Sequence, residues 1–92
     1  MHTESARLIF YIPSATSLKH KRQVCRSLID KTKQRFNVSI AEVASQDVHQ
    51  TLTIGIAIVS GTANHAEQSL AAVIRYLEEH ASAELVNIEV GH

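Results

Sequence analysis

The sequence is poor in residues that interrupt secondary structure, in cysteine and in tryptophan. Its 92 residues include no tryptophan, one cysteine, one proline and three glycines. One cysteine excludes an internal disulfide, and we expect a reducing, cytoplasmic setting. So little proline and glycine argues against a disordered or low-complexity chain. No apolar run approaches the ~18–20 residues of a membrane span, so we expect no membrane among its partners.

Charge is balanced overall but unevenly distributed. Residues 1–46 hold eight Lys or Arg against three Asp or Glu, a balance of +5, whereas residues 47–92 have a balance of −5. The zero net charge argues against indiscriminate nucleic-acid binding, but the asymmetry leaves one strongly basic surface. The length predicts a single domain that spans residues 1–92.

Hydrophobic periodicity predicts six elements. They are a strand at 6–12, a helix from Leu18 to about Phe36, strands at 38–46 and 51–60, a helix capped by Asn64 that runs to about His80, and a strand at 84–90. The order βαββαβ predicts an α+β ferredoxin-like plait, with a four-stranded antiparallel sheet and both helices on one face. We expect the strand order fourth, first, third, second, with a bulge in the second strand near Ala41 or Glu42.

The first helix carries most of the positive charge. Cys25, Leu28 and Thr32 belong to its apolar stripe, and cationic residues lie on the flanks of that stripe. Only Asp30 offers a counter-charge within the helix. The predicted nucleic-acid-binding residues are Lys19, Lys21, Arg22, Arg26 and Lys33. The alternative is an ordinary solvated helix face.

No pattern indicates catalysis, a metal or a cofactor, and we expect the protein not to be an enzyme. The six histidines show no i,i+4 pair, and a second cysteine is lacking. Cys25 lies on the buried stripe, where a thiol stays protonated. The loop after the first strand lacks the arginine and glycines of an acylphosphatase-like phosphate loop. Stacking aromatics of an RNA-recognition motif are absent from the third strand.

The face of the sheet away from the helices is the second candidate surface. The alternation of the first and third strands places Ile9, Tyr11, Ala57 and Val59 there. Exposed apolar patches often mark a partner surface, so we expect self-association through this face or through an edge strand. The small residues Gly55 and Ala57 further indicate that something packs closely on the third strand.

Several segments resemble the domain of unknown function 503 family, the YlxP-like proteins. They are Ser17-Leu18-Lys19, Lys21-Arg22, Val24, Phe36-Asn37-Val38-Ser39, Ala41-Glu42-Val43, Gln46-Asp47 and Gly55-Ile56-Ala57-Ile58-Val59-Ser60. The resemblance covers nearly the whole chain and implies a ferredoxin-like fold without established enzymatic activity. Family genes often lie beside those of a translation initiation factor and a ribosome-binding factor. One departure is His49, where the family often has an aromatic residue.

These observations favour a small non-enzymatic protein that binds RNA or a ribosomal subunit through its basic helix. The alternative, from a different class, is a homo-oligomeric module that binds a small regulatory ligand on the same fold. Ribosome co-sedimentation would favour the first hypothesis, and ligand binding between subunits would favour the second.

Overall fold

The computed structural model describes residues 1–13 and 15–91 and contains the six expected elements in the expected order. Their bounds are β1 His2–Tyr11, α1 Leu18–Arg35, β2 Ser39–Ala44, β3 Thr51–Ser60, α2 Ala63–His80 and β4 Glu84–Val90. Within the described ranges, no helix is both long enough and apolar enough to cross a membrane.

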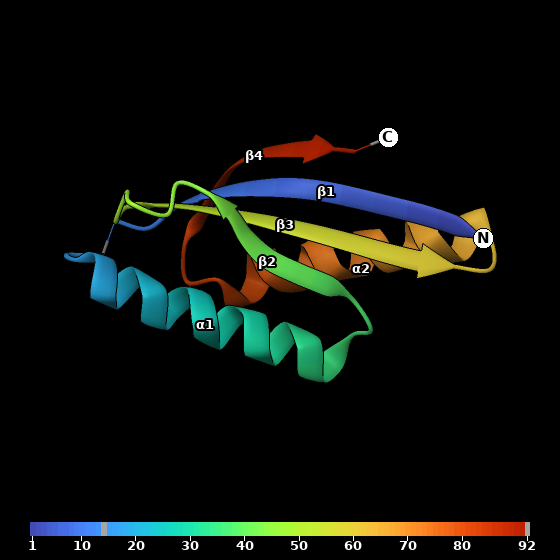
Figure 1. Ribbon diagram of the computed structural model, residues 1–92, viewed down its shortest axis with the longest axis horizontal. Helices are drawn as coiled ribbons and strands as arrows, with labels where there is room; N and C mark the ends of the chain where they lie inside the picture. Colours follow the sequence, from blue (N-terminus) through green and yellow to red (C-terminus); the bar gives the residue numbers. More distant parts are fainter. Residues whose placement is uncertain (14, 92) are drawn as a thin grey trace.

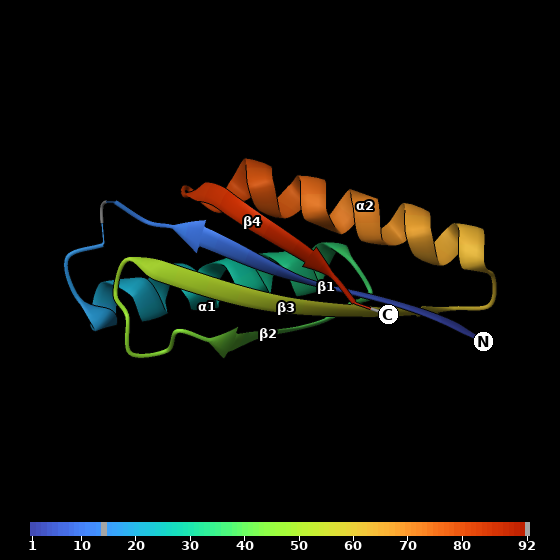
Figure 2. The same cartoon turned by 90° about the horizontal axis from the view of Figure 1, so that it is seen from above.

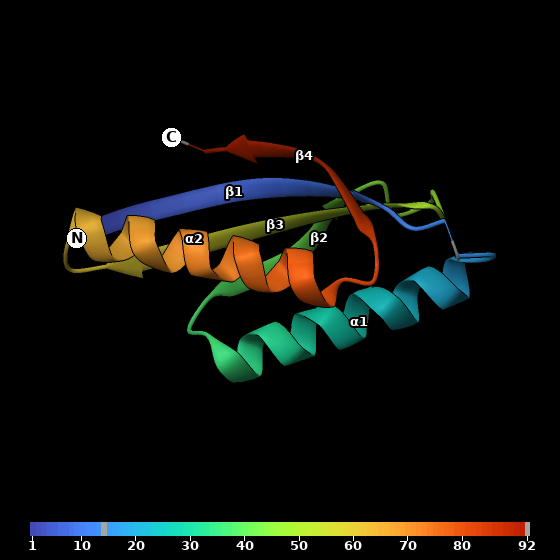
Figure 3. The same ribbon diagram turned by 180° about the vertical axis from the view of Figure 1, so that it is seen from behind.

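The four strands form one antiparallel sheet in the order β2-β3-β1-β4 (Figures 1 and 2). The central strands β1 and β3 pair without interruption from His2↔Ser60 to Tyr11↔Thr51. The shorter strands β2 and β4 are the edges. Both helices lie on the same side of the sheet (Figure 3), which confirms the predicted ferredoxin-like plait and its strand order.

The core lies between the sheet and the helices, because each strand directs alternate apolar residues to that side. Leu8 and Phe10 of β1 and Ile54 of β3 are completely buried. Helix α2 covers β1 and β3, whereas α1 packs against β2 and α2. Ile29 of α1 and Ile74 of α2 are partly buried and pack against the edge of this core.

The start of β1 and the cap of α2 differ from the sequence prediction for identifiable reasons. Strand β1 begins at His2 rather than residue 6, because β3 continues to Ser60 and offers a partner along that length. Helix α2 is capped by Thr62 rather than Asn64, and the Thr62 hydroxyl accepts a hydrogen bond from the His65 amide at 3.2 Å.

Strand β2 carries the expected irregularity. Its register against β3 shifts between Glu42 and Ala44, next to the predicted position, and the strand ends at Ala44 rather than at residue 46. The shift leaves Val43 as the extra residue, a geometry that bends the strand and re-aims side chains. Val43 is half exposed as a result, and Glu42 faces the helix layer opposite Ile54.

Candidate nucleic-acid interface and open sheet face

Four of the five predicted nucleic-acid-binding residues form one exposed row along α1. Lys19, Arg22, Arg26 and Lys33 are all solvent exposed. At about 100° of rotation per residue, they fall within about 60° of the helix circumference. Among residues 1–13 and 15–91, the ion pairs are Arg7–Glu89 and Lys21–Glu42, and neither involves this row. We call the four residues the basic ridge.

Lys21 does not belong to the ridge, and its prediction as a nucleic-acid contact is wrong. Its side chain is completely buried. The Lys21 ammonium donates hydrogen bonds to the backbone carbonyl oxygens of Ser45, of Val48 at 2.9 Å and of Thr51 at 3.0 Å. A carboxylate oxygen of Glu42 lies 3.0 Å away and balances the charge. Lys21 therefore joins α1 to the loop between β2 and β3.

A signal for this role was present in the helical spacing. Lys21 lies four residues before Cys25, and the buried face of α1 runs through Lys21, Cys25, Leu28 and Thr32. A lysine on this face has to find oxygen partners, since an unpaired buried charge is strongly unfavourable. Sequence alone does not show those partners, because they come from residues 21 to 30 positions away along the chain.

The loop held by Lys21 has an unusual backbone. Ser45 adopts a left-handed conformation with φ of 60°, and its hydroxyl lies 3.0 Å from that of Thr53. These contacts orient the Ser45 carbonyl toward the ammonium. The loop then exposes Val48 and His49 to solvent. His49, which stands where an aromatic was expected from the family resemblance, is thus on a loop that a buried ion pair holds in place.

Cys25 is a core residue, as its place on the apolar stripe indicated. Burial, followed by the negative charge of Glu42, raises the pKa of the Cys25 thiol to about 11, against a smaller opposing effect of Lys21. A thiol in this environment stays protonated and is a poor nucleophile. Within residues 1–13 and 15–91, no three His, Cys, Asp or Glu side chains are arranged to hold a metal ion.

The predicted interface residues lie on the open face of the sheet. Tyr11, Ala57 and Val59 are exposed and Ile9 is partly buried, with neither helix over them. Val43 from the bulge of β2 adds another half-exposed apolar side chain to this face. The open face therefore presents apolar side chains from three neighbouring strands.

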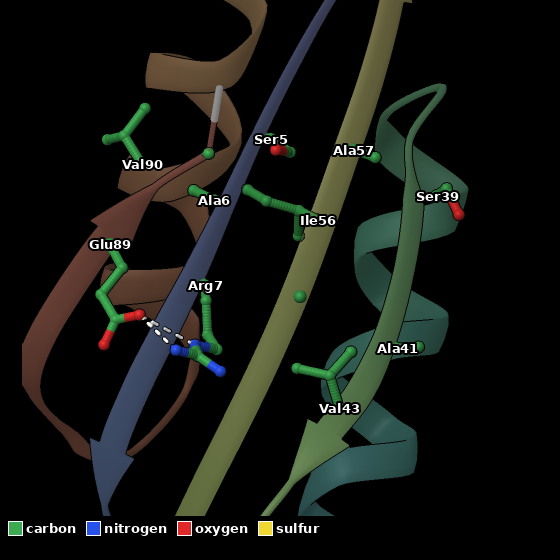
Figure 4. Close-up of a pocket in the computed structure, with 12 residues that line it drawn as sticks. Ser5, Ala6, Arg7, Ser39, Ala41, Val43, Ile56, Ala57, Glu89 and Val90 are labelled. Atoms are coloured by element: carbon green, nitrogen blue, oxygen red, sulfur yellow. Dashed lines mark hydrogen bonds and ion pairs between the residues drawn. The ribbon is translucent and has the colours of Figure 1, made fainter.

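A shallow hollow of about 490 Å³ occupies the middle of this open face (Figure 4). Gly55 and Ala57 contribute to its lining, Val43 stands on one side, and the ion pair of Arg7 with Glu89 stands on the other. A Cβ atom on Gly55 would lie only 2.7 Å from Cγ1 of Val43. The small residues of β3 predicted that something packs closely on this strand. At Gly55 that neighbour is Val43 of the same chain.

A cluster of rings between the helices was not anticipated from the sequence. The rings of Tyr76 and His80 stack with centroids 4.0 Å apart and an angle of 20° between their planes. Phe36 meets the edge of Tyr76 at 5.4 Å, and the guanidinium of Arg35 lies 5.5 Å from the Tyr76 ring centroid. The i,i+4 spacing of Tyr76 and His80 was the available signal.

Comparisons with known proteins agree with this architecture. Residues 4–90 match the family described as Protein of unknown function (DUF503). The Uncharacterized protein YlxP of Bacillus subtilis (strain 168) is 36% identical over 73 residues, which cover 79% of each chain. A de novo designed protein with a ferredoxin fold, solved by solution NMR, superposes with a TM-score of 0.65 at 16% identity and covers 100% of this chain and 87% of its own.

The designed structure supports the fold alone, since its sequence is unrelated at that level of identity. The family match spans residues 4–90, which include the basic helix and the loop that Lys21 holds, and the Bacillus relative covers 79% of the chain. On these grounds the chain belongs to the DUF503 family of proteins of unknown function.

Proposed function

We propose that this protein is a cytoplasmic, non-enzymatic RNA-binding protein that associates with a ribosomal subunit through the basic ridge of α1. One observation carries the proposal: the four ridge cations are exposed, aligned and without an ion-pair partner among the described residues. A solvated helix face usually alternates its charges, whereas this one presents mainly a single sign. Long basic side chains can keep their stems on the domain while their charges reach a phosphate backbone.

Charge on the rest of the molecule supports a defined orientation. Residues 47–92 have six carboxylates and one cation, Arg75. These carboxylates repel a polyanion, so we expect RNA to approach from the side of α1. Phosphate contacts position a protein without reading sequence, and binding is therefore expected to be modest and largely sequence-independent.

The test is co-sedimentation with purified ribosomal subunits at two or more salt concentrations. Three to four phosphate contacts predict a log–log salt slope of roughly −2 to −3 for single-stranded RNA. Reversing the ridge with Arg22→Glu and Arg26→Glu is expected to abolish association and leave the fold intact, because both side chains are exposed. Unchanged affinity of this folded variant would show that the ridge is only a solvated surface.

A matched pair of variants separates the ridge from net charge. Arg22→Gln with Arg26→Gln removes two positive charges from the ridge. Gln68→Glu with Ala71→Glu changes the net charge equally on exposed positions of α2. The ridge pair is expected to reduce the salt slope by roughly 1.4, and the α2 pair to leave the slope unchanged. Equal effects of the two pairs would assign binding to net charge rather than to the ridge.

We also infer a second candidate function, a homo-oligomeric ligand-binding module, from the open face. Its hollow lies beside exposed apolar residues and an Arg7–Glu89 pair whose side chains are half exposed. Both signs of charge on one face make that face self-complementary under a two-fold axis, so we expect a second copy of this chain to cover it and the ligand to bind between the two copies.

Light scattering tests the second candidate. Tyr11→Asp with Val59→Asp introduces charge on the open face and is expected to yield a monomer from an oligomeric wild type. A wild type that is already monomeric at high concentration rules out this candidate and leaves the RNA proposal untouched.

A further inference from the structure

We infer that the groove between α1 and α2 is a stacking site for one unpaired nucleobase, with the His80 ring as its platform. The inference rests on the proposed function, because it names single-stranded RNA as the class of nucleic acid that the ridge would bind. The groove is lined by residues of α1 and α2, two helices that approach each other near the C-terminal end of α2 (Figure 3).

His80 lies where two hollows of this groove meet. One hollow, of about 370 Å³, is lined by residues that include Tyr76 and Arg75. The other, of about 300 Å³, is lined by residues that include Gln23, Ser27 and Lys31. His80 lines both hollows, and its ring stacks on that of Tyr76, which lines the first.

The orientation of the His80 ring is already set. Its Nδ1 lies 2.9 Å from the Tyr76 backbone carbonyl oxygen. Because a carbonyl oxygen can only accept, the proton is on Nδ1, which donates the hydrogen bond. The His80 ring also stacks face to face on the Tyr76 ring, which further restricts its orientation. A flat, exposed and oriented ring is what a nucleobase requires for stacking, because little conformational freedom is lost on binding.

The second hollow supplies complementary groups around that platform. Gln23 and Ser27 line this hollow with groups that can hydrogen-bond to a base edge, and Lys31 adds a cation that can meet a phosphate. In the first hollow, Arg35 and Arg75 outnumber the single carboxylate of Glu79. The groove therefore combines aromatic rings with net positive charge, the combination typical of single-strand binding surfaces.

NMR titration with AMP, using ribose 5-phosphate as the matched probe without a base, tests the stacking site directly. AMP is expected to shift the ring-proton signals of His80 and Tyr76, and ribose 5-phosphate to leave them in place. His80→Ala is expected to remove the AMP-dependent shift at Tyr76, whereas His2→Ala, an exposed histidine at the end of β1, keeps it. Equal shifts with both probes, or none with either, overturn the inference.

Binding of a single-stranded RNA oligomer distinguishes this site from the ridge. His80→Ala is expected to weaken binding by about 5- to 100-fold with an unchanged salt slope, because stacking releases no counterions. Arg22→Gln with Arg26→Gln reduces the slope instead. If His80→Ala binds the oligomer like the wild type while the ridge variant loses affinity, the stacking site is wrong and the proposed function stands. If neither change alters binding, both are wrong.

Discussion

The ammonium of Lys21 and the carboxylate of Glu42 lie 3.0 Å apart beneath the sheet, and the Lys21 side chain is entirely inaccessible to solvent. Glu42 is on edge strand β2 and Lys21 is in the first turn of α1. Their ion pair therefore links the helix to the edge of the sheet. The surrounding carbonyl groups of residues 45–51 complete the coordination of the ammonium. One buried charge thus organises a helix, a strand and a loop.

Replacing Lys21 by methionine is expected to lower the free energy of unfolding by about 3 to 5 kcal/mol, because it leaves the Glu42 carboxylate and several carbonyl groups without their partner. Arg22→Met, at the neighbouring exposed position, is expected to change it by about 0.5 kcal/mol or less. Chemical denaturation of both variants measures the difference. A loss below about 1 kcal/mol in Lys21→Met would contradict the structural role of the charge.

Glu42→Gln added to Lys21→Met is expected to recover part of the lost stability, since the neutral amide no longer leaves a partly buried charge unpaired. The measurement is a double-mutant cycle in denaturant. Strictly additive effects of the two substitutions would indicate that the residues are not coupled.

The stability of the protein is expected to fall between pH 9 and 11 in a way that depends on Cys25. The folded-state pKa is raised to about 11 from an ordinary value of 9.0, so the unfolded thiol loses its proton first. The unfolded state then binds fewer protons, and the free energy of unfolding declines with rising pH, by about 3 kcal/mol across that window. Cys25→Val measured over the same pH range serves as the control. Parallel pH profiles of the two proteins would contradict the raised pKa.

Ile56→Ala is expected to cost about 2 to 5 kcal/mol of folding stability, because Ile56 is buried in the central strand β3 and its removal leaves a cavity. Val59→Ala, on the exposed face of the same strand, is expected to cost much less. Thermal and denaturant unfolding measure both. Similar losses of folding stability in the two variants would contradict the assignment of Ile56 to the buried face of β3 and of Val59 to the exposed face.

Gly55→Ala and Val43→Ala are expected to be coupled. An added Cβ at position 55 meets the Val43 methyl group at 2.7 Å, so Val43 has to leave its preferred rotamer at a cost of about 0.5–1.5 kcal/mol. In a Val43→Ala background that methyl group is absent, and Gly55→Ala becomes less destabilising by about the same amount. A coupling free energy near zero would show that Val43 does not cover Gly55.

Local patterns in the sequence were sufficient for the architecture. The large apolar residues at alternate positions of 51–60 predicted both the existence of β3 and the face that it buries, because a strand has a period of two. The order of strands and helices then indicated the ferredoxin-like plait. Helix α1 begins after Ser17, whose hydroxyl accepts a hydrogen bond from the His20 amide at 3.1 Å. Each of these features depends on residues that are close together in the chain.

Helical spacing places Lys21 on the buried face of α1, but only the tertiary structure supplies the oxygen atoms that accept hydrogen bonds from its ammonium. Lys21 and Arg22 are adjacent and chemically alike, yet one is buried and the other exposed. Likewise, only the packing of α1 against α2 brought Phe36 and Arg35 to Tyr76. The physical reason is that the burial of a charge or the stacking of rings is stabilised by partners distant in sequence, and the folded chain is what places the carbonyl groups of residues 45–51 around the Lys21 ammonium.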